Sequence, residues 1–98
     1  MINFTNIYSI VSKIPQGRVM TYKQIAILSG LKNPRNVGLA LHRNTDGDKV
    51  PCHRVIRSDG KLASGYAFGG MRKQKEKLEK EGVGFINDRV NLRKFLLS

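Results

Sequence analysis

Cys52 and His53 are neighbours in the chain. A thiol and an imidazole are side chains that together can carry out nucleophilic chemistry. A free thiol holds only a few per cent thiolate at neutral pH, and an imidazole nearby can take its proton or lower its pKa by positive charge. Pro51 precedes the pair and fixes the backbone there. Because adjacent side chains of an extended segment point to opposite faces, we expect a bridging water to join the thiol and the imidazole.

A carboxylate that orients the imidazole would complete an arrangement of nucleophile, base and orienting group. The candidates in the sequence are Glu76, Glu79, Glu81 and Asp59. The residues alone leave one alternative open, a buried thiol beside a hydrogen-bonded histidine with no chemical role. Cys52 is the single cysteine, which excludes an intramolecular disulfide and a Cys-rich zinc site. A zinc site made by Cys52, His53 and His42 would have unsuitable ligand spacing, and we expect no metal.

The charge of the chain favours a polyanionic partner. Eighteen Lys and Arg residues against seven Asp and Glu give a net charge of +11 in 98 residues and a pI near 10.3. Such an excess attracts polyanions at long range, and each cation set against a phosphate releases a counterion. Nucleic acid is therefore the expected partner, with an anionic membrane surface as the alternative. A small ribosomal or architectural protein would show the same totals.

Length and hydropathy limit the class of protein further. Ninety-eight residues predict one small domain over 1–98. No apolar run approaches the ~18 residues that cross a bilayer, and the N-terminal stretch has neither an early charge nor a small-residue cleavage site. We therefore expect a cytoplasmic protein without membrane association, close to the nucleoid if the source is prokaryotic.

Apolar spacing in the first half predicts three short helices. Thr5 is the expected cap of the first, and Thr21 begins the second as an N-cap with Gln24 three residues on, the pattern of a capping box. The third begins with Asn33 and has Pro34 at its first position. The expected inward-facing residues are Phe4, Ile7, Tyr8, Val11, Ile14, Ile25, Leu28, Val37, Ala40 and Leu41.

The second and third predicted helices are joined by a turn over residues 29–32, where Gly30 ends the second helix. Two short helices joined in this way form a helix-turn-helix, here over about 21–43. In that arrangement the helix from Pro34 to about Arg43 addresses the duplex. The spacing alone also suits an ordinary helical hairpin, and the basic composition favours the DNA-binding interpretation.

Turn signals divide the second half of the chain. Two polar loops, 45–49 and 58–61, enclose the segment 50–56 that contains the cysteine. A second loop over 65–70 is rich in glycine, which leaves its backbone free to approach a ligand closely.

A charged helix is predicted from Met71 to about Glu81, with Gly82 at its end. Its expected inward-facing residues are Met71, Leu78 and, by its stem, Lys75. We expect a small hairpin around 87–88 and a closing apolar contact from 95–97. The fold class is therefore mainly α, a helix-turn-helix (winged-helix-like) domain with a short β-hairpin.

Several motifs together resemble the O6-alkylguanine-DNA alkyltransferase family. The segment 51–55, Pro-Cys-His-Arg-Val, resembles the family's active-site signature, and 35–38, Arg-Asn-Val-Gly, is similar to its recognition helix. The other matching motifs are 14–19 with Thr21-Tyr22, Arg43-Asn44, Gly65-Tyr66 with Gly69-Gly70, and Leu78 with Glu81-Gly82. They occur in the family's order from about residue 4 to residue 83, so the resemblance covers most of the chain.

The resemblance implies a reaction and its catalytic residues. An alkyl group would pass from O6-alkylguanine in double-stranded DNA to Cys52, and because nothing hydrolyses the thioether product the protein would act once. His53 would act as base through a water, Glu81 would hold His53, and Asn44 would brace the turn. No cofactor is implied, and we expect a monomer.

The resemblance also implies how the base is reached, since a paired base must be flipped out of the stack. Arg35 would fill the vacated stack, and Tyr22 would press on the 3′ phosphate and help form the substrate pocket. Val55 would accept from the guanine amino group through its carbonyl, and the phenol of Tyr66 would donate to the purine as negative charge develops there. The implied DNA-contacting residues are Arg35, Tyr22, Thr21 and Asn36.

The chain departs from the full-length family in ways that keep other functions open. Nothing corresponds to the family's N-terminal domain, the loop 45–49 is polar, and Phe68 leaves the alignment of the glycine-rich loop uncertain by one position. The size and the tail from Val83 look more like the short alkyltransferase-like proteins, which bind the same lesions without repair and commonly replace the nucleophile. This chain keeps Cys52. Alkyl transfer is thus the leading function, with a lesion sensor that recruits other repair proteins and a plain helix-turn-helix regulator as alternatives.

Overall fold

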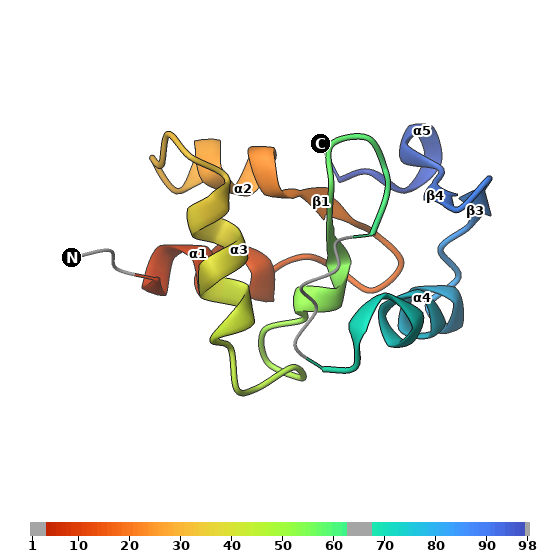
Figure 1. Ribbon diagram of the computed structural model, residues 1–98, viewed down its shortest axis with the longest axis horizontal. Helices are drawn as coiled ribbons and strands as arrows, with labels where there is room; N and C mark the ends of the chain where they lie inside the picture. Colours follow the sequence, from red (N-terminus) through yellow and green to blue (C-terminus); the bar gives the residue numbers. More distant parts are fainter. Residues whose placement is uncertain (1–3, 63–67, 98) are drawn as a thin grey trace.

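The computed structural model describes residues 4–62 and 68–97. Its helices are α1 (Thr5–Ser12), α2 (Tyr22–Leu28), α3 (Arg35–His42), α4 (Gly70–Lys80) and α5 (Leu92–Phe95), with a 3₁₀ turn η1 (Cys52–Arg54). Its strands are β1 (Met20–Thr21), β2 (Val55–Ile56), β3 (Phe85–Ile86) and β4 (Arg89–Val90). The mainly helical fold with a short hairpin that the sequence predicts is confirmed (Figure 1).

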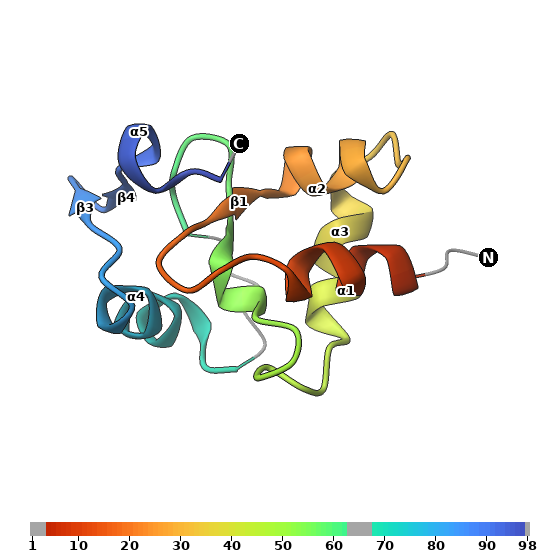
Figure 2. The ribbon, with the colours of Figure 1, turned by 180° about the vertical axis from the view of Figure 1, so that it is seen from behind.

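The helices α1, α2 and α3 gather at one end of the molecule, and α4, α5 and the β3–β4 hairpin lie at the other (Figures 1 and 2). The Tyr8 hydroxyl on α1 donates to the Ala40 carbonyl on α3 at 2.7 Å, which ties those two helices together. The predicted apolar face of α3 is buried. On α2 the buried residues are Ile25 and Ala26, whereas Leu28 is 62% exposed, so the prediction that Leu28 faces the core is wrong.

The start of α2 follows the predicted capping box. The Thr21 hydroxyl accepts from the Gln24 backbone at 3.1 Å, and the Thr21 backbone donates to the Gln24 side chain at 2.9 Å. Ser29 ends the helix and Gly30 follows with φ of +75°, a conformation that glycine adopts without steric penalty. The turn between α2 and α3 is therefore encoded locally.

The other two predicted helix starts shift by one residue. The N-cap of α1 is Phe4 rather than Thr5, and it makes no side-chain cap bond. The first residue of α3 is Arg35, with Pro34 in the N-cap position, and the helix ends at His42. Asn33 still caps α3 chemically, because its side-chain oxygen accepts from the Arg35 backbone at 3.0 Å.

A short parallel pair, β1 with β2, joins the two ends of the molecule. Met20 pairs with Val55 and Thr21 with Ile56. The pair separates two apolar clusters. One contains Ile7, Val11, Ile14, Met20, Ile25, Ala26, Val37, Ala40, Leu41, Cys52 and Val55, and the other contains Val19, Ile56, Leu78, Val83 and Val90. The cysteine thus belongs to the cluster under α1–α3, directly beside the strand that connects to α4.

On α4 the buried residues are Gln74 and Leu78. Met71 is 49% exposed, so its predicted inward position is wrong. It lies in the first turn of the helix, where it lines an open hollow with Arg57 and Leu62 instead of packing into the second cluster. No helix among residues 4–62 and 68–97 is long and apolar enough to cross a membrane.

The predicted hairpin is confirmed between β3 and β4, whose pairing is Phe85 with Val90 and Ile86 with Arg89. Asn87 and Asp88 form its turn with φ values of 51° and 64°. Positive φ at both central residues is the requirement of a type I′ turn, and Asn and Asp tolerate it better than other side chains.

Candidate functional site

Cys52 and His53 begin the 3₁₀ turn η1, which lies between α1–α3 and α4. The Cys52 backbone donates to the Val50 carbonyl at 2.8 Å and the Arg54 backbone to the Pro51 carbonyl at 2.9 Å. The expectation of an extended segment with side chains on opposite faces is wrong, because residues of a 3₁₀ turn follow each other at about 120°. Both side chains are buried, Cys52 with 4% and His53 with 7% exposed.

Asn44 lies beside the thiol, where the sequence places it. Its amide Nδ2 donates to the Val50 carbonyl at 2.9 Å and lies 3.8 Å from the Cys52 Sγ. Its Oδ1 accepts from the Asp46 backbone at 3.1 Å. Asn44 therefore holds both sides of the loop that leads to the cysteine and points a donor at the sulfur.

Burial raises the pKa of the Cys52 thiol above its ordinary value, while the Asn44 amide, a backbone hydrogen bond and the Lys77 charge on α4 act in the opposite direction. Burial prevails because the low-dielectric core disfavours the thiolate more than these three favour it. At neutral pH Cys52 is thus a thiol that needs a base before it can act as a nucleophile.

His53 contacts a carboxylate directly. Its Nε2 lies 2.7 Å from Oε2 of Glu81, the residue that ends α4. A neutral imidazole that donates from Nε2 to a carboxylate keeps Nδ1 as its acceptor. Burial lowers the pKa of His53, and Glu81 opposes that shift without reversing it. The ring is therefore neutral at pH 7 and can accept a proton. Of the four candidate carboxylates, Glu81 is the one that contacts His53.

Arg54 is a member of this network that the sequence analysis did not single out. Its guanidinium donates to both Glu81 oxygens, Nε to Oε1 at 2.9 Å and Nη2 to Oε2 at 2.8 Å, and its Nη1 donates to the Ile14 carbonyl at 2.8 Å. Burial acts against ionisation of Glu81, but the bonds from Arg54 and His53 outweigh it, so the pKa of Glu81 falls below its ordinary value. The signal available in the sequence was an arginine directly after the histidine, inside the motif 51–55.

Gln74 is a second residue that sequence reasoning missed. It is 1% exposed on α4, and its Nε2 donates to the His53 and Val55 carbonyls at 3.0 Å each. The Val55 carbonyl, which the resemblance assigns to the guanine amino group, thus already accepts one hydrogen bond. A carbonyl oxygen has a second lone pair to offer.

Tyr22, the first residue of α2, is half-buried and lies near Cys52. Burial, and to a lesser extent the negative charge that Cys52 carries as a thiolate, raise the pKa of Tyr22 to about 12, so it stays a neutral phenol. It also lines an open hollow of about 400 Å³ together with Lys23, Pro34 and Arg57. Tyr66 falls on residues that lie outside the described parts of the chain.

The expected DNA-contacting residues have different environments. Arg35 is exposed at the first position of α3, and Asn36 beside it is half-buried. Thr21 is only 6% exposed and its hydroxyl is used in the cap of α2, so a DNA contact from that side chain stays a prediction. Neither α2 nor α3 has an acidic residue in its first turn, and residues 1–45 contain none at all. This end of the molecule is therefore suited to phosphates.

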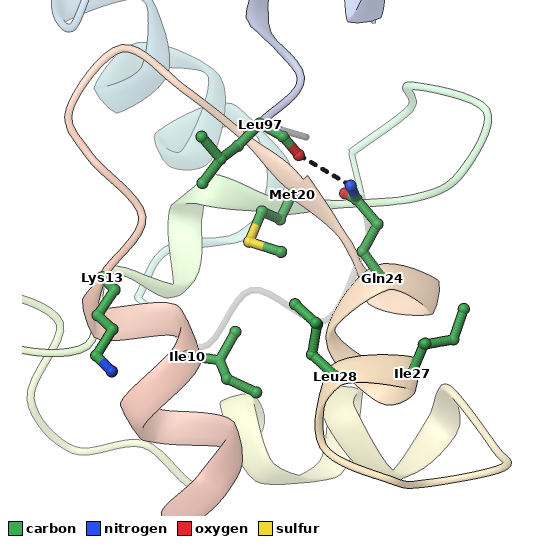
Figure 3. A pocket seen from close by; sticks show the side chains of 7 residues that line it. All are labelled: Ile10, Lys13, Met20, Gln24, Ile27, Leu28 and Leu97. Carbon is green, nitrogen blue, oxygen red and sulfur yellow. Dashed lines mark hydrogen bonds between the residues drawn. The ribbon is translucent and has the colours of Figure 1, made fainter.

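An apolar hollow lies away from the cysteine, between α1, α2 and the C-terminal segment (Figure 3). It has a volume of about 520 Å³ and includes none of the expected site residues. Its lining residues are Ile10, Lys13, Met20, Gln24, Ile27, Leu28 and Leu97. The Gln24 side chain donates to the Leu97 carbonyl at 2.9 Å and fixes one wall (Figure 3). Within the described residues no group of three His, Cys, Asp or Glu side chains could hold a metal ion.

These features define a class: a helix-turn-helix domain with a buried thiol in a hydrogen-bonded network between its helices and α4. The chain belongs to the family described as 6-O-methylguanine DNA methyltransferase, DNA binding domain, which matches residues 3–83. The resemblance stated from the motifs is thereby confirmed.

Two of the similar proteins have names that indicate different functions. The methylated-DNA–protein-cysteine methyltransferase of Methanothermobacter thermautotrophicus is 47% identical over 77 residues, which are 79% of this chain and 42% of the relative. Alkyltransferase-like protein 1 of Schizosaccharomyces pombe is 40% identical over 81 residues, which are 82% of this chain and 75% of the relative. The chain spans about half the length of the curated methyltransferases that it matches.

Among solved structures, the fold resembles that of S. pombe Atl1 in complex with damaged DNA containing O6-carboxymethylguanine. The TM-score is 0.86 at 34% sequence identity, and the match covers 97% of this chain and 94% of the other. It therefore includes the hairpin and α5, which lie beyond the residues that the family description covers.

Proposed function

We propose that this protein repairs DNA by moving an alkyl group from O6-alkylguanine to Cys52 in a single turnover. The observation that carries the proposal is the hydrogen-bonded network around the thiol. Asn44 lies beside Sγ, and the adjacent His53 is held by Glu81 at 2.7 Å. A cysteine buried only for packing needs no amide aimed at its sulfur and no histidine–carboxylate pair next to it.

The proton of the thiol is the first requirement of the reaction. His53 donates to Glu81 from Nε2 and accepts the Cys52 proton at Nδ1 through a water. The carboxylate stabilises the imidazolium that forms, in the manner of a nucleophile–base–orienter set. The thiolate then attacks the alkyl carbon, the carbon–sulfur bond forms as the carbon–O6 bond breaks, and the electron pair of that bond stays on the purine.

The leaving purine carries negative charge until it is protonated, so donors around it lower the barrier. Tyr66 supplies a phenol there, and the carbonyl of Val55 accepts from the 2-amino group and identifies the base as guanine. The proton that left Cys52 returns to the purine, which leaves unmodified guanine and an S-alkyl cysteine. Because no group hydrolyses the thioether, one protein molecule repairs one lesion.

The duplex is bound by the cationic end of the molecule and opened there. Arg35 extends from the exposed start of α3 and takes the place of the flipped base, and Tyr22, at the start of α2, presses on the neighbouring phosphate. Asn36 and Thr21 contribute further DNA contacts. Flipping costs a few kcal/mol, and less for a damaged pair, which favours the lesion over intact DNA.

Mass spectrometry of the intact protein tests the proposal. After incubation with a duplex that contains one O6-methylguanine, we expect the protein to gain the mass of one methylene group, on the peptide that contains Cys52. Cys52→Ala is the control and should bind the same duplex without any gain in mass. Unmodified protein after prolonged incubation would contradict alkyl transfer.

A second function, lesion binding without transfer, is favoured by one observation. The structural match to S. pombe Atl1 covers 97% of the chain, whereas solved methyltransferase structures match between 78% and 90% of it. In that case the protein marks O6-alkylguanine for other repair proteins. Preference for a methylated over an unmodified duplex, combined with an unchanged protein mass, would identify this function.

A further inference from the structure

Gln74 is buried in the centre of a helix whose exposed residues are mainly charged. Its side chain is 1% exposed and points from α4 into the turn that carries the cysteine. Nε2 donates to the His53 carbonyl and to the Val55 carbonyl, both at 3.0 Å. A carboxamide nitrogen has two N–H donors, so both are used and the plane of the amide is fixed.

The other end of the same amide is unsatisfied. Gln74 Oε1 is buried and has no hydrogen-bond partner among the described residues. A buried acceptor without a partner destabilises the folded state, and an apolar side chain of similar length would avoid that penalty. Such a side chain would, however, leave the His53 and Val55 carbonyls without this donor. The two donated bonds therefore account for a glutamine at this position.

The two carbonyls lie on either side of Arg54, where η1 ends and β2 begins. Val55 has φ of −109° and ψ of 125°, the extended conformation in which the chain leaves the turn, and it pairs with Met20 in β1. Gln74 on α4 thus fixes the direction of the Val55 carbonyl through its hydrogen bond, and the pairing with β1 fixes the backbone of the same residue.

We propose that Gln74 is a positioning residue that aims the Val55 carbonyl at the 2-amino group of the flipped purine, and so sets the selectivity of the pocket for guanine. The inference rests on the proposed function, which assigns the Val55 carbonyl to that amino group. Gln74 occupies one lone pair of the carbonyl oxygen and leaves the second for the base. Without Gln74 the carbonyl loses its restraint from α4, and the pocket no longer distinguishes a purine that carries the amino group from one that lacks it.

A pair of duplexes tests this directly. One contains O6-methylguanine and the other O6-methylhypoxanthine, which differs from it only by the absence of the 2-amino group. Affinities are measured in the Cys52→Ala background, so that transfer does not consume the lesion. We expect the parent protein to prefer O6-methylguanine by about tenfold, which corresponds to about 1.4 kcal/mol. With Gln74→Met the preference should fall below about threefold.

Lys80→Met, an exposed substitution on the same helix, is the matched control and should keep the full preference. Thermal unfolding of each variant shows whether it is folded, and Gln74→Asn replaces Gln74→Met if that variant is not. Asparagine keeps the amide, but its shorter side chain cannot reach both carbonyls, so the preference should again be lost.

The outcomes separate the inference from the function on which it rests. If the parent protein binds neither methylated duplex better than unmodified DNA, the proposed function fails. If it recognises the lesion but ignores the 2-amino group, or if the Gln74 variants keep the parent's preference, the positioning role of Gln74 is overturned while lesion recognition stands. A purely structural role would weaken binding to both duplexes equally and leave their ratio unchanged.

Discussion

Arg54 holds the Glu81 carboxylate with two parallel hydrogen bonds, Nε to Oε1 at 2.9 Å and Nη2 to Oε2 at 2.8 Å. Oε2 is also the atom that faces His53 at 2.7 Å. Bidentate pairs of this kind restrict rotation of the carboxylate as well as adding energy. His53, the base of the proposed reaction, is therefore oriented by the Glu81 carboxylate. Arg54, the residue directly after His53, in turn fixes that carboxylate.

Glu81→Gln should slow alkyl transfer by more than tenfold, equivalent to about 1.4 kcal/mol or more of transition-state stabilisation. The substitution keeps the shape of the side chain but removes the charge that stabilises a protonated His53. Single-turnover transfer from a methylated duplex measures the effect. Glu76→Gln and Glu79→Gln are the matched controls, and a larger effect from either of them would show that Glu81 is the wrong carboxylate.

Arg54→Lys should destabilise the fold although it keeps the positive charge. Lysine cannot reproduce the planar fork that contacts both Glu81 oxygens and the Ile14 carbonyl. Loss of a hydrogen bond between charged, largely buried groups lowers the free energy of unfolding by about 2 kcal/mol, which urea denaturation measures. Arg57→Lys is the control, because its ion pair with Asp59 is exposed and should contribute little. Equal effects of the two substitutions would contradict the importance of the Arg54–Glu81 pair.

Stability should fall on acidification in a window set by His53. Burial is the main cause that lowers the pKa of His53 below its ordinary value of 6.5. At a pH between the lowered and the ordinary pKa, the His53 imidazole is protonated in the unfolded chain but neutral in the folded protein. The free energy of unfolding therefore decreases as the pH falls below about 6.5. The lowered pKa of Glu81 adds a further loss below its ordinary value of 4.5.

Urea unfolding at pH 7.5 and at pH values down to about 5 checks this expectation. His53→Gln removes the titrating group, so its stability should change less over the same interval. The transfer rate should hold over the upper part of this interval and decline only as the pH approaches the lowered pKa of His53 in the folded protein, since a protonated His53 cannot accept the thiol proton. A stability that is independent of pH between these limits, or identical slopes for both proteins, would show that His53 does not titrate as its burial indicates.

Asn44→Ala should make the Cys52 thiol less reactive. The amide near Sγ opposes the effect of burial on the pKa of Cys52, and its removal leaves that pKa further raised. Alkylation by iodoacetamide at pH 7.5 should slow by about tenfold, the equivalent of one hydrogen bond to a charged group. Asn33→Ala removes a surface capping amide and serves as the control. An unchanged alkylation rate for Asn44→Ala would mean that the 3.8 Å approach does not stabilise the thiolate.

Local signals in the sequence account for much of the fold. The Thr21–Gln24 capping box, the glycine after α2 and the Asn87–Asp88 turn each act over a few residues, so their effect can be read from the chain directly. Glu81 was chosen from four carboxylates by resemblance, and the contact with His53 agrees with that choice.

What the sequence could not supply depends on contacts between distant segments. Strands of two residues have no periodicity, so the pairing of β1 with β2 left no pattern to detect. A glutamine in a charged helix is normally solvated, and only the approach of α4 to the cysteine turn buries Gln74. Leu28 has helical spacing with Ile25 yet lines the open hollow of Figure 3 and is 62% exposed, and spacing alone does not show which part of a helix face other elements cover.

Arg35→Ala and Lys23→Ala should affect the protein in different ways, although both remove an exposed positive charge, Lys23 near the start of α2 and Arg35 at the start of α3. If Lys23 contacts a phosphate, its loss weakens binding to every duplex and makes the dependence of affinity on salt shallower by about one unit of slope. Arg35 is proposed to fill the stack left by the flipped base. Its loss should leave the docked complex largely intact and lower the rate of transfer from duplex DNA sharply.

Transfer from the free modified base distinguishes these roles, because a free base needs no flipping. With Arg35→Ala, transfer from the free O6-methylguanine base should proceed at nearly the parent rate while transfer from the methylated duplex falls. With Lys23→Ala, weaker duplex binding should be compensated by lower salt or higher DNA concentration, since only the docked state is affected. If Arg35→Ala slows both reactions equally, Arg35 supports the substrate pocket itself, and its side chain does not replace the flipped base in the stack.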